Sequence, residues 1–355
     1  IADSLSATVA QLAHEATGLE AEVFRFKLPQ PRSGGTLKVG IHRATALSSV
    51  RGLDPCFTSD LQLTEVSAAL YSTLLRLEDG QLVGGLAERW EADPTARRFR
   101  FSLKRGVAFH DGTRLTAAHV KAHYERLLDP KVGSPDAGLL KDVDGADAFT
   151  AGTAQGVSGI TVLDDLTLEI RLREPRAYFL RLLTLPATAV AHRGDGGRFV
   201  GTGAFRESGE APGARLVLER HAGFHQSGLP HLSRLELHAF DTREAALAAL
   251  ERQDVDLVSY LHSEHAALVK SETIQLATAQ TPSTWFLGFN AAQPPFGDAR
   301  VRRAVRAGLD VRGLVERFHP GARIARSLTP PGLLEVERVH EPRTDVTLAR
   351  QLLSE

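Results

Sequence analysis

Residues 99–130 read FRFSLKRGVAFHDGTRLTAAHVKAHYERLLDP, and this stretch carries the clearest signals of local structure in the chain. Apolar and polar side chains alternate over 99–104, which predicts a half-buried strand. A tight turn follows, in which Gly112 is free to take a positive φ. A helix is then predicted from Thr116 as N-cap. Its inward face carries residues at helical spacing, namely Val120, Tyr124, Leu127 and Leu128.

The adjacent His110 and Asp111 in the turn invite a catalytic interpretation. Neighbours in sequence are not thereby hydrogen-bonded in space, and His-Asp-Gly before a helix has the composition of a turn. The chain contains no G-x-S-x-G nucleophile motif, and the single Cys56 has no obvious partner. The sequence therefore predicts a scaffold turn here, and no enzymatic activity.

Composition narrows the class of protein. A chain of 355 residues usually divides into two lobes. With 42 Lys and Arg against 43 Asp and Glu, the net charge is -1, which gives no reason to expect nucleic acid as a partner. No apolar run approaches the ~20 residues that span a bilayer. The first residues, IADSLSATVAQ, lack the pattern of a signal peptide, so we expect that one was removed or never existed.

Strands and helices alternate through the rest of the chain. TLKVGI (36–41) predicts a strand, and GITVL and LTLEIRL (159–163 and 166–172) predict a hairpin. LELHAF (235–240), a helix beginning near Asp241, and DVDLVSY (254–260) predict a βαβ unit with some parallel sheet. Together these patterns indicate an α/β fold.

Residues 1–33 form a separate region. Apolar residues recur there at spacings of three and four, which predicts a helix, and LPQPRSGG (28–35) ends it as a linker. This helix could dimerise or join domains, or it could pack on its own lobe. Three heptads are the lower limit for a coiled coil, so packing on its own lobe is the favoured interpretation.

Two groups of histidines are spaced so that their side chains could bind a metal ion. His119 and His123 stand at i and i+4 of the predicted helix, but without a third ligand two solvated side chains are the simpler interpretation. His221, His225 and His231 lie among Gly and Pro residues, which is typical of a surface loop. VGTGAF (200–205) lacks the third glycine of a dinucleotide fingerprint and predicts a tight turn. The sequence predicts no metal and no cofactor.

Several segments, in order, resemble one known family. They are GGTLKVG, LDP, ALYSTLLRLEDGQLVGGLAERWE, the stretch quoted above, VGTGAF, DVDLV and LGFNAAQPPFGDARVRRAVRAGLD. Together they resemble the peptide- and nickel-binding solute-binding proteins, family 5, of ABC importers. The resemblance covers about residues 34–355.

The resemblance implies a two-lobed clamp of the type II periplasmic-binding-protein (Venus-flytrap) class, with an inserted α+β subdomain and a second lobe that is incomplete in this chain. DVTLARQLLSE, at the end, resembles a helix after which family members continue. The implied division is an N-terminal helix and linker (1–33), lobe I (34–70 and 195–290), the inserted subdomain (71–194) and the start of lobe II (291–355).

The resemblance also implies a ligand site. The positions that match ligand-lining segments of the family are the stretch after LDP, which is Thr58, Ser59, Asp60 and Leu61, and the residue after SP, which is Asp136. Asp136 departs from the aromatic that the family often has there. TWFLGFN (284–290), with Trp285 and Asn290, is equally well a core segment or a pocket wall.

The favoured hypothesis is a monomeric extracytoplasmic receptor that delivers short peptides or other small solutes to the transmembrane subunits of an ABC permease. The alternative is a ligand-sensing domain of a cytoplasmic transcriptional regulator, favoured by the absent signal peptide and the helix before residue 33. A metal-dependent hydrolase is a third hypothesis, and it needs a third ligand near His119 and His123.

Overall fold

The computed structural model describes residues 34–42, 53–57, 61–209, 215–259, 269, 271, 274–277, 284–319, 322–325 and 343–354. The predicted helix within 1–33 lies outside them. The chain divides into two compact units, whose described residues are those of 34–259 and those of 269–354. The boundaries predicted for lobe I, the inserted subdomain and lobe II stay a prediction.

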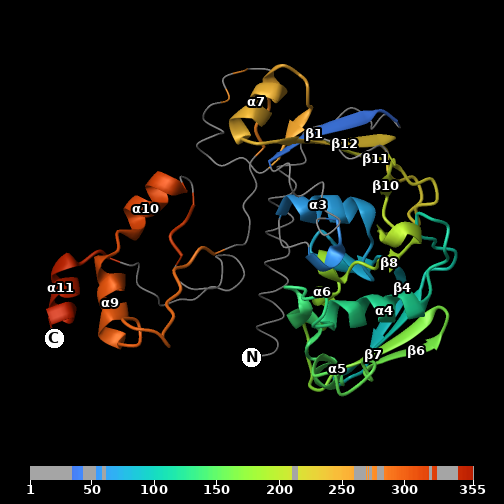
Figure 1. The fold of residues 1–355 in the computed structure, drawn as a ribbon, viewed down its shortest axis with the longest axis horizontal. Coiled ribbons are helices and arrows are strands. Elements are labelled where there is room, and N and C mark those ends of the chain that lie inside the picture. Colours follow the sequence, from blue (N-terminus) through green and yellow to red (C-terminus); the bar gives the residue numbers. More distant parts are fainter. Residues whose placement is uncertain are drawn as a thin grey trace. The chain divides into compact units, whose positions relative to one another are not determined.

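A five-stranded sheet forms one part of the 34–259 unit (Figure 1). Its strands, in spatial order, are β10 (Phe205–Glu207), β11 (Arg215–Arg220), β12 (Arg234–Phe240), β1 (Thr36–His42) and β13 (Leu257–Val258). β1 runs parallel to both β12 and β13. The predicted βαβ unit is confirmed, since α7 (Arg243–Glu251) connects β12 to β13. The helix is capped by Thr242, whose Oγ1 accepts from the Ala245 N–H, and not by Asp241 as the sequence suggested.

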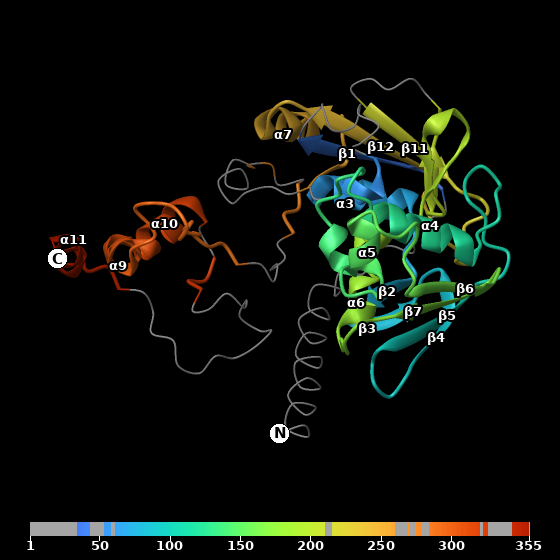
Figure 2. The ribbon, with the colours of Figure 1, turned by 60° about the horizontal axis from the view of Figure 1, so that its bottom comes forward.

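Helix α3 (Leu61–Leu70) packs beneath this sheet, on the side away from α7, in both views (Figures 1 and 2). Val66 and Leu70 share a core with Val39 and Ile41 of β1. The predicted turn at 200–205 lies against the end of α3. A Cβ on Gly201 would come within 2.0 Å of the Leu70 carbonyl oxygen, so the close approach itself requires glycine.

A four-stranded antiparallel sheet forms the second part of this unit. Its strands, in spatial order, are β4 (Ala87–Ala92), β5 (Arg98–Leu103), β7 (Thr167–Arg171) and β6 (Ile160–Asp164). The strand predicted at 99–104 and the hairpin at 159–172 are both confirmed. Two short pairs accompany the sheet: β2 (Leu75–Glu78) with β3 (Gln81–Gly84), and β8 (His192–Arg193) with β9 (Phe199–Val200).

Helix α4 (Ala117–Leu128) shares a core with the four-stranded sheet. Its N-cap is Thr116, as predicted, and the residues predicted to face inward are all buried. Shorter helices complete the unit: α5 (Ala146–Thr150), α6 (Phe179–Leu182), and the 3-10 helices η1 (Pro55–Phe57), η2 (Ala137–Leu140), η3 (Pro186–Thr188) and η4 (Asp195–Gly197).

The 269–354 unit contains helices α9 (Ala299–Gly308), α10 (Val311–Phe318) and α11 (Val346–Ser354). α9 packs against α11, where a Cβ on Gly308 would lie 3.4 Å from the Ala349 Cβ. Within the described part of the chain, no helix combines the length and apolar character that crossing a membrane requires.

Candidate functional site

A partly buried ion pair joins helix α4 to the segment before residue 58. Near the end of α4, Arg126 donates from Nη1 to Asp54 Oδ1 at 2.8 Å and from Nη2 to the other carboxylate oxygen. Asp54 is only 3% exposed. Such bidentate pairing fixes direction as well as distance, so the two segments are held in one geometry.

Two further contacts complete the surroundings of Arg126. Nη1 also donates to the Cys56 sulfur at 2.9 Å, and the guanidinium carbon lies 3.9 Å from the centre of the Phe199 ring. Burial, opposed by Arg126, raises the pKa of the Cys56 thiol to about 12. Cys56 is therefore a packed thiol, and not an activated nucleophile.

Residues 134–136 lie next to Cys56. The Ser134 hydroxyl donates to the Cys56 carbonyl oxygen at 2.7 Å, and the Asp136 N–H donates to the Ser134 hydroxyl at 3.1 Å. We call these five residues the Asp54–Arg126 corner: Asp54, Cys56, Arg126, Ser134 and Asp136. The corner brings the segment that leads into 58–61 next to the segment that carries Asp136.

Of the residues predicted to bind ligand, Asp136 is the one placed in this corner. Its side chain is half-buried, and its carboxylate has no ion-pair or hydrogen-bond partner among the residues that the structure describes. Burial raises the pKa of the Asp136 carboxyl. Thr58, Ser59 and Asp60 lie outside the described residues, and Leu61 is described only as the first residue of α3.

Trp285 and Asn290 belong to the 269–354 unit. The Trp285 side chain is 79% exposed and its ring lies 4.9 Å from the His319 ring. Asn290 Oδ1 accepts from the Ala292 N–H at 3.1 Å. Neither is a core residue in this structure, and their part in ligand binding stays a prediction.

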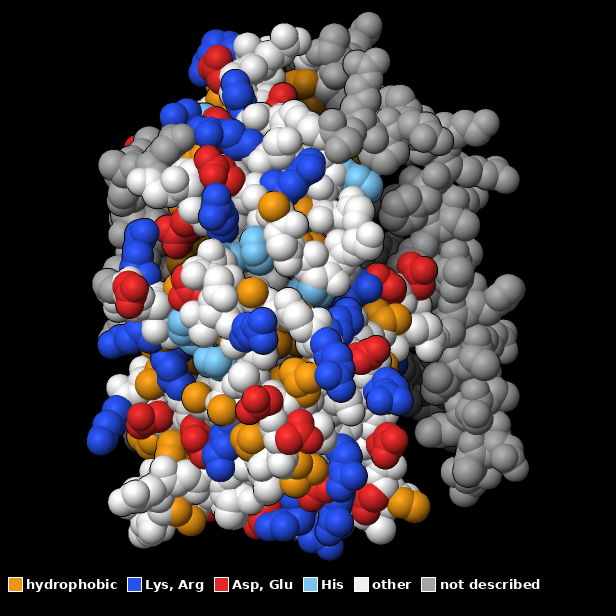
Figure 3. Space-filling view, turned by 90° about the vertical axis from the view of Figure 1, so that its right-hand side faces the viewer, with side chains coloured by type: hydrophobic (Ala, Val, Ile, Leu, Met, Phe, Trp, Pro, Cys, Tyr) orange, Lys and Arg blue, Asp and Glu red, His pale blue; other side chains and the backbone are white. Residues whose placement is uncertain are grey.

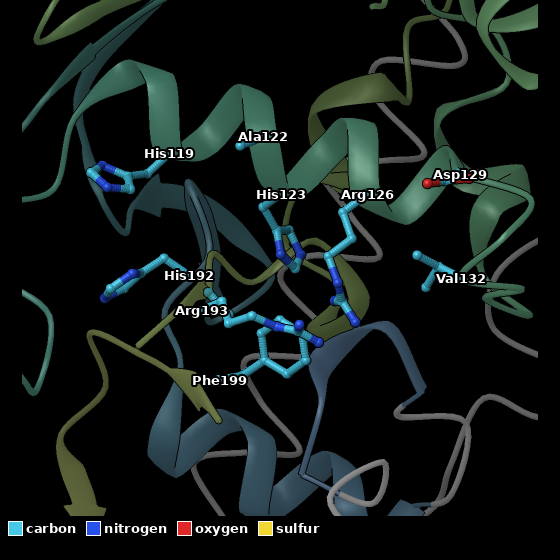
Figure 4. Close-up of a pocket in the computed structure, with 10 residues that line it drawn as sticks. His119, Ala122, His123, Arg126, Asp129, Val132, His192, Arg193 and Phe199 are labelled. Atoms are coloured by element: carbon cyan, nitrogen blue, oxygen red, sulfur yellow. The ribbon is translucent and has the colours of Figure 1, made fainter. Parts of the chain in front are cut away.

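A pocket of about 420 Å³ opens beside the corner and shares Arg126 with it (Figure 4). In Figure 4, His123 and Arg126 extend from α4 toward Arg193 and Phe199. The lining residues are His119, Ala122, His123, Arg126, Asp129, Val132, Ala191, His192, Arg193 and Phe199.

The family model described as "Bacterial extracellular solute-binding proteins, family 5 Middle" matches residues 81–355. The chain belongs to this family. Among curated relatives, the probable deoxycholate-binding periplasmic protein YgiS of Escherichia coli (strain K12) is 28% identical over 324 residues, which is 85% of this chain and 60% of that protein. The glutathione-binding protein GsiB of Salmonella choleraesuis is 25% identical over 319 residues, which is 87% of this chain and 60% of that protein.

Solved structures agree with this membership. The Escherichia coli murein tripeptide binding protein MppA is 25% identical, with a TM-score of 0.76, over 90% of this chain and 66% of that chain. Haemophilus influenzae OppA, in complex with the peptide RPPGFSPFR, is 20% identical with a TM-score of 0.77, over 91% and 66%, and supports the fold alone. The predicted α/β fold of the type II periplasmic-binding-protein class is confirmed. The chain spans about 60% of the length of the curated relatives named here.

In this family 5 chain His110 and Asp111 have separate partners. His110 Nε2 donates to the Gly203 carbonyl oxygen at 3.1 Å, and burial lowers the pKa of His110 to about 4. Asp111 accepts from the Thr113 N–H at 2.9 Å, and Gly112 takes a φ of 88°. The predicted scaffold turn is confirmed.

A His–Asp pair does occur, between residues that the sequence did not connect. His192 Nε2 lies 2.8 Å from Asp111 Oδ2, although the two residues are 81 positions apart. No local pattern around His192 indicated this contact. It closes the 105–115 turn onto the β8 strand.

His119 and His123 do not converge. His119 Nδ1 accepts from the Thr116 N–H at 3.1 Å, while His123 Nε2 donates to the Ala187 carbonyl oxygen at 3.1 Å. The prediction that both are solvated is wrong for His123, which is 1% exposed and whose pKa burial lowers to about 4. Among the described residues, no three His, Cys, Asp or Glu side chains are placed to hold a metal ion.

Of the three histidines predicted in a surface loop, His231 is exposed as expected, whereas the rings of His221 and His225 are half-buried and contact the rest of the unit. His221 Nδ1 lies 3.2 Å from the Gly203 carbonyl oxygen, and His225 Nε2 lies 3.1 Å from the Ser72 hydroxyl. His231 is exposed, and its carbonyl oxygen accepts from the Gly34 N–H. The face of the molecule drawn in Figure 3 carries several histidines among Lys and Arg side chains.

Proposed function

We propose that this chain is part of an extracytoplasmic receptor that captures short peptides, or other small solutes, and presents them to the transmembrane subunits of an ABC importer. Family 5 membership over residues 81–355 is the observation that carries the proposal. The family description and the YgiS name support a location outside the cytoplasm. We further propose that the receptor is a monomer.

The Asp54–Arg126 corner supports a binding role for this part of the chain. A ligand-binding segment costs less entropy on binding when it is ordered beforehand. Here the residues just before 58–61 are fixed by a bidentate ion pair, and residues 134–136 are fixed by the Ser134 hydroxyl. We propose that Thr58, Ser59, Asp60, Leu61 and Asp136 contact the ligand from this preordered base.

The surroundings of Asp136 indicate a chemical group that the ligand would carry. A half-buried carboxylate that has no ion-pair partner among the described residues gains Coulomb energy and a charge-assisted hydrogen bond when an ammonium group docks against it. The amino terminus of a short peptide, or a basic side chain, is such a group. We therefore propose that Asp136 pairs with a ligand cation.

Binding without chemistry fits the groups that are present. The Cys56 thiol is buried with a raised pKa, and His110 is held by a backbone carbonyl with its pKa lowered. In the proposed mechanism the ligand stabilises a closed arrangement of two lobes, because some contacts form only when both face it. We propose that the protein is not an enzyme.

Isothermal titration calorimetry on the full-length gene product tests this proposal. Di- to pentapeptides are titrated into the wild type, Asp136→Asn and the control Asp241→Asn, whose exposed carboxylate lies next to the cap of α7. We expect the Asp136→Asn variant to bind about tenfold more weakly, since one charge-assisted hydrogen bond is lost. Equal affinities for all three proteins would contradict the role of Asp136, and no binding of any peptide would contradict the ligand class.

A further inference from the structure

Two histidines from distant segments donate to one carbonyl oxygen. His110 donates from Nε2 to the Gly203 carbonyl oxygen at 3.1 Å, and His221 donates from Nδ1 to the same oxygen at 3.2 Å. Their rings meet edge to face, with centres 4.8 Å apart. The His110 N–H also donates to the Gly201 carbonyl oxygen at 2.9 Å. The turn at 201–204, which joins β9 to β10, is therefore held by side chain and backbone together.

His225 holds the same turn through Ser72. The Ser72 hydroxyl donates its one proton to the Thr202 carbonyl oxygen at 3.2 Å, so it accepts from the His225 Nε2–H at 3.1 Å. His225 Nδ1 therefore carries no proton in the neutral ring, and it is buried without a hydrogen-bond partner among the described residues. Thr202 is fully buried, so a charge placed beside it is poorly hydrated.

Both half-buried rings are unfavourable places for a positive charge. Arg206 faces His110. Lys104 and Arg76 face His225. Burial is the largest cause that lowers the pKa of His110 and of His225 to about 4, and the neighbouring cations act in the same direction.

Acidic groups offset only part of this cost. Asp111 faces His110, but it also lies 2.8 Å from His192 Nε2. Among the residues that the structure describes, no carboxylate contacts the His225 ring. Three other carboxylates lie next to the basic residues themselves, namely Glu219 at Arg206, Glu78 at Arg76 and Glu88 at Lys104. Burial therefore remains the main cost of adding a proton to either ring.

We propose that His110 and His225 form an acid-sensitive switch: as neutral rings they hold the 201–204 turn in place, and their protonation favours a locally opened turn. Opening exposes both rings to water, where an imidazolium is hydrated. The hydrogen bond from His110 Nε2 survives protonation, so the added charge, and not a lost bond, favours opening. None of these residues is among those proposed to contact the ligand, so the switch does not depend on the proposed receptor function.

The direction of the effect follows from proton binding. In the opened turn both histidines regain an ordinary pKa near 6.5, so between pH 6.5 and about 4 the opened turn binds more protons than the closed one. Opening therefore becomes more favourable as the pH falls. A change from pH 7.5 to pH 5 should raise the opened population by about 30-fold for each histidine.

Amide hydrogen exchange, measured by mass spectrometry on the full-length gene product at pH 7.5 and pH 5, tests the switch. The rates are corrected for the intrinsic pH dependence of exchange. We expect the protection of peptides from 106–112 and 201–205 to fall by at least about 30-fold at pH 5, and the protection of β5 and β7 to fall much less. An equal loss in all these segments, or no loss in any, would overturn the proposal.

Three variants locate the titrating groups. His110→Gln and His225→Gln each replace an imidazole by an amide that still donates a hydrogen bond, and we expect each to remove about 30-fold of the pH effect. His231→Gln removes an exposed histidine between β11 and β12, and we expect the wild-type response. Circular dichroism melting curves at pH 7.5 check that the variants are folded; if one of the first two is not, the other decides. A pH effect that stays at its wild-type size without His110 and without His225 would contradict the switch.

Discussion

The Asp54–Arg126 corner and the 284–290 segment contain residues predicted to bind ligand, yet their surroundings differ. In the corner, polar groups from distant parts of the chain satisfy one another, and Asp54 and Cys56 are buried. In the segment, Trp285, Phe286 and Leu287 are 79%, 73% and 60% exposed. The corner is ordered by its own contacts, whereas the exposed apolar side chains of the segment contribute little to the stability of this chain.

Removing the cation of the corner has the largest expected effect. Arg126→Ala leaves the Asp54 carboxylate buried without its partner, which costs about 3–5 kcal/mol in the free energy of unfolding. Urea denaturation of the wild type and the variant measures it. The double variant Asp54→Asn with Arg126→Ala is expected to recover part of the loss, because the unpaired charge is gone. A loss below about 1 kcal/mol would show that the pair is only a surface bridge.

His123 lies one turn before Arg126 on α4, and it makes the free energy of unfolding depend on pH. Its pKa in the folded protein is about 4, against an ordinary value near 6.5, so between these values the unfolded chain binds the extra proton. Stability therefore falls as the pH drops from about 6.5 to 4, by up to about 1.4 kcal/mol per unit for this group.

Denaturation curves at several pH values between 4 and 7.5 compare wild type with His123→Gln. The variant has no imidazole to protonate, and we expect a shallower loss of stability at low pH. Parallel pH profiles would show that His123 does not contribute. Asp111 has a lowered pKa in the folded state, so its contribution to stability also decreases at low pH. This contribution is the same in both proteins and does not affect the difference between their pH profiles.

The smallest effect is expected in the 284–290 segment. Trp285→Ala removes a large side chain that is mostly in water, so the free energy of unfolding of this chain should change by less than about 0.5 kcal/mol. The same urea titration measures it. A loss above about 2 kcal/mol would contradict the prediction that this segment contributes much less to stability than the corner does.

Local patterns predicted the elements well, and contacts between distant segments were beyond them. Alternation around Phe99 and helical spacing around Tyr124 depend on neighbours in sequence, so the strand and the helix could be predicted. The pairs Asp54–Arg126 and Asp111–His192 join residues 72 and 81 positions apart. Nothing in a single sequence states such a pairing, and for the same reason the burial of His123 was missed.

The family resemblance supplied what spacing could not. It selected Asp136, which the fold places in the corner beside Cys56 and Ser134. It gave no account of the pocket between α4 and β8. That pocket depends on how Arg193 and Phe199, from one short strand pair, meet a helix about 70 residues earlier in the chain.

Native mass spectrometry of the full-length protein purified from its own host tests the receptor account most directly. The account predicts a bound small solute, a short peptide in the first instance, that dissociates on mild activation. It also predicts that the solute keeps its mass after prolonged incubation with the protein. A protein that carries no solute and binds none from a peptide mixture, or one that returns the peptide cleaved, would contradict the account.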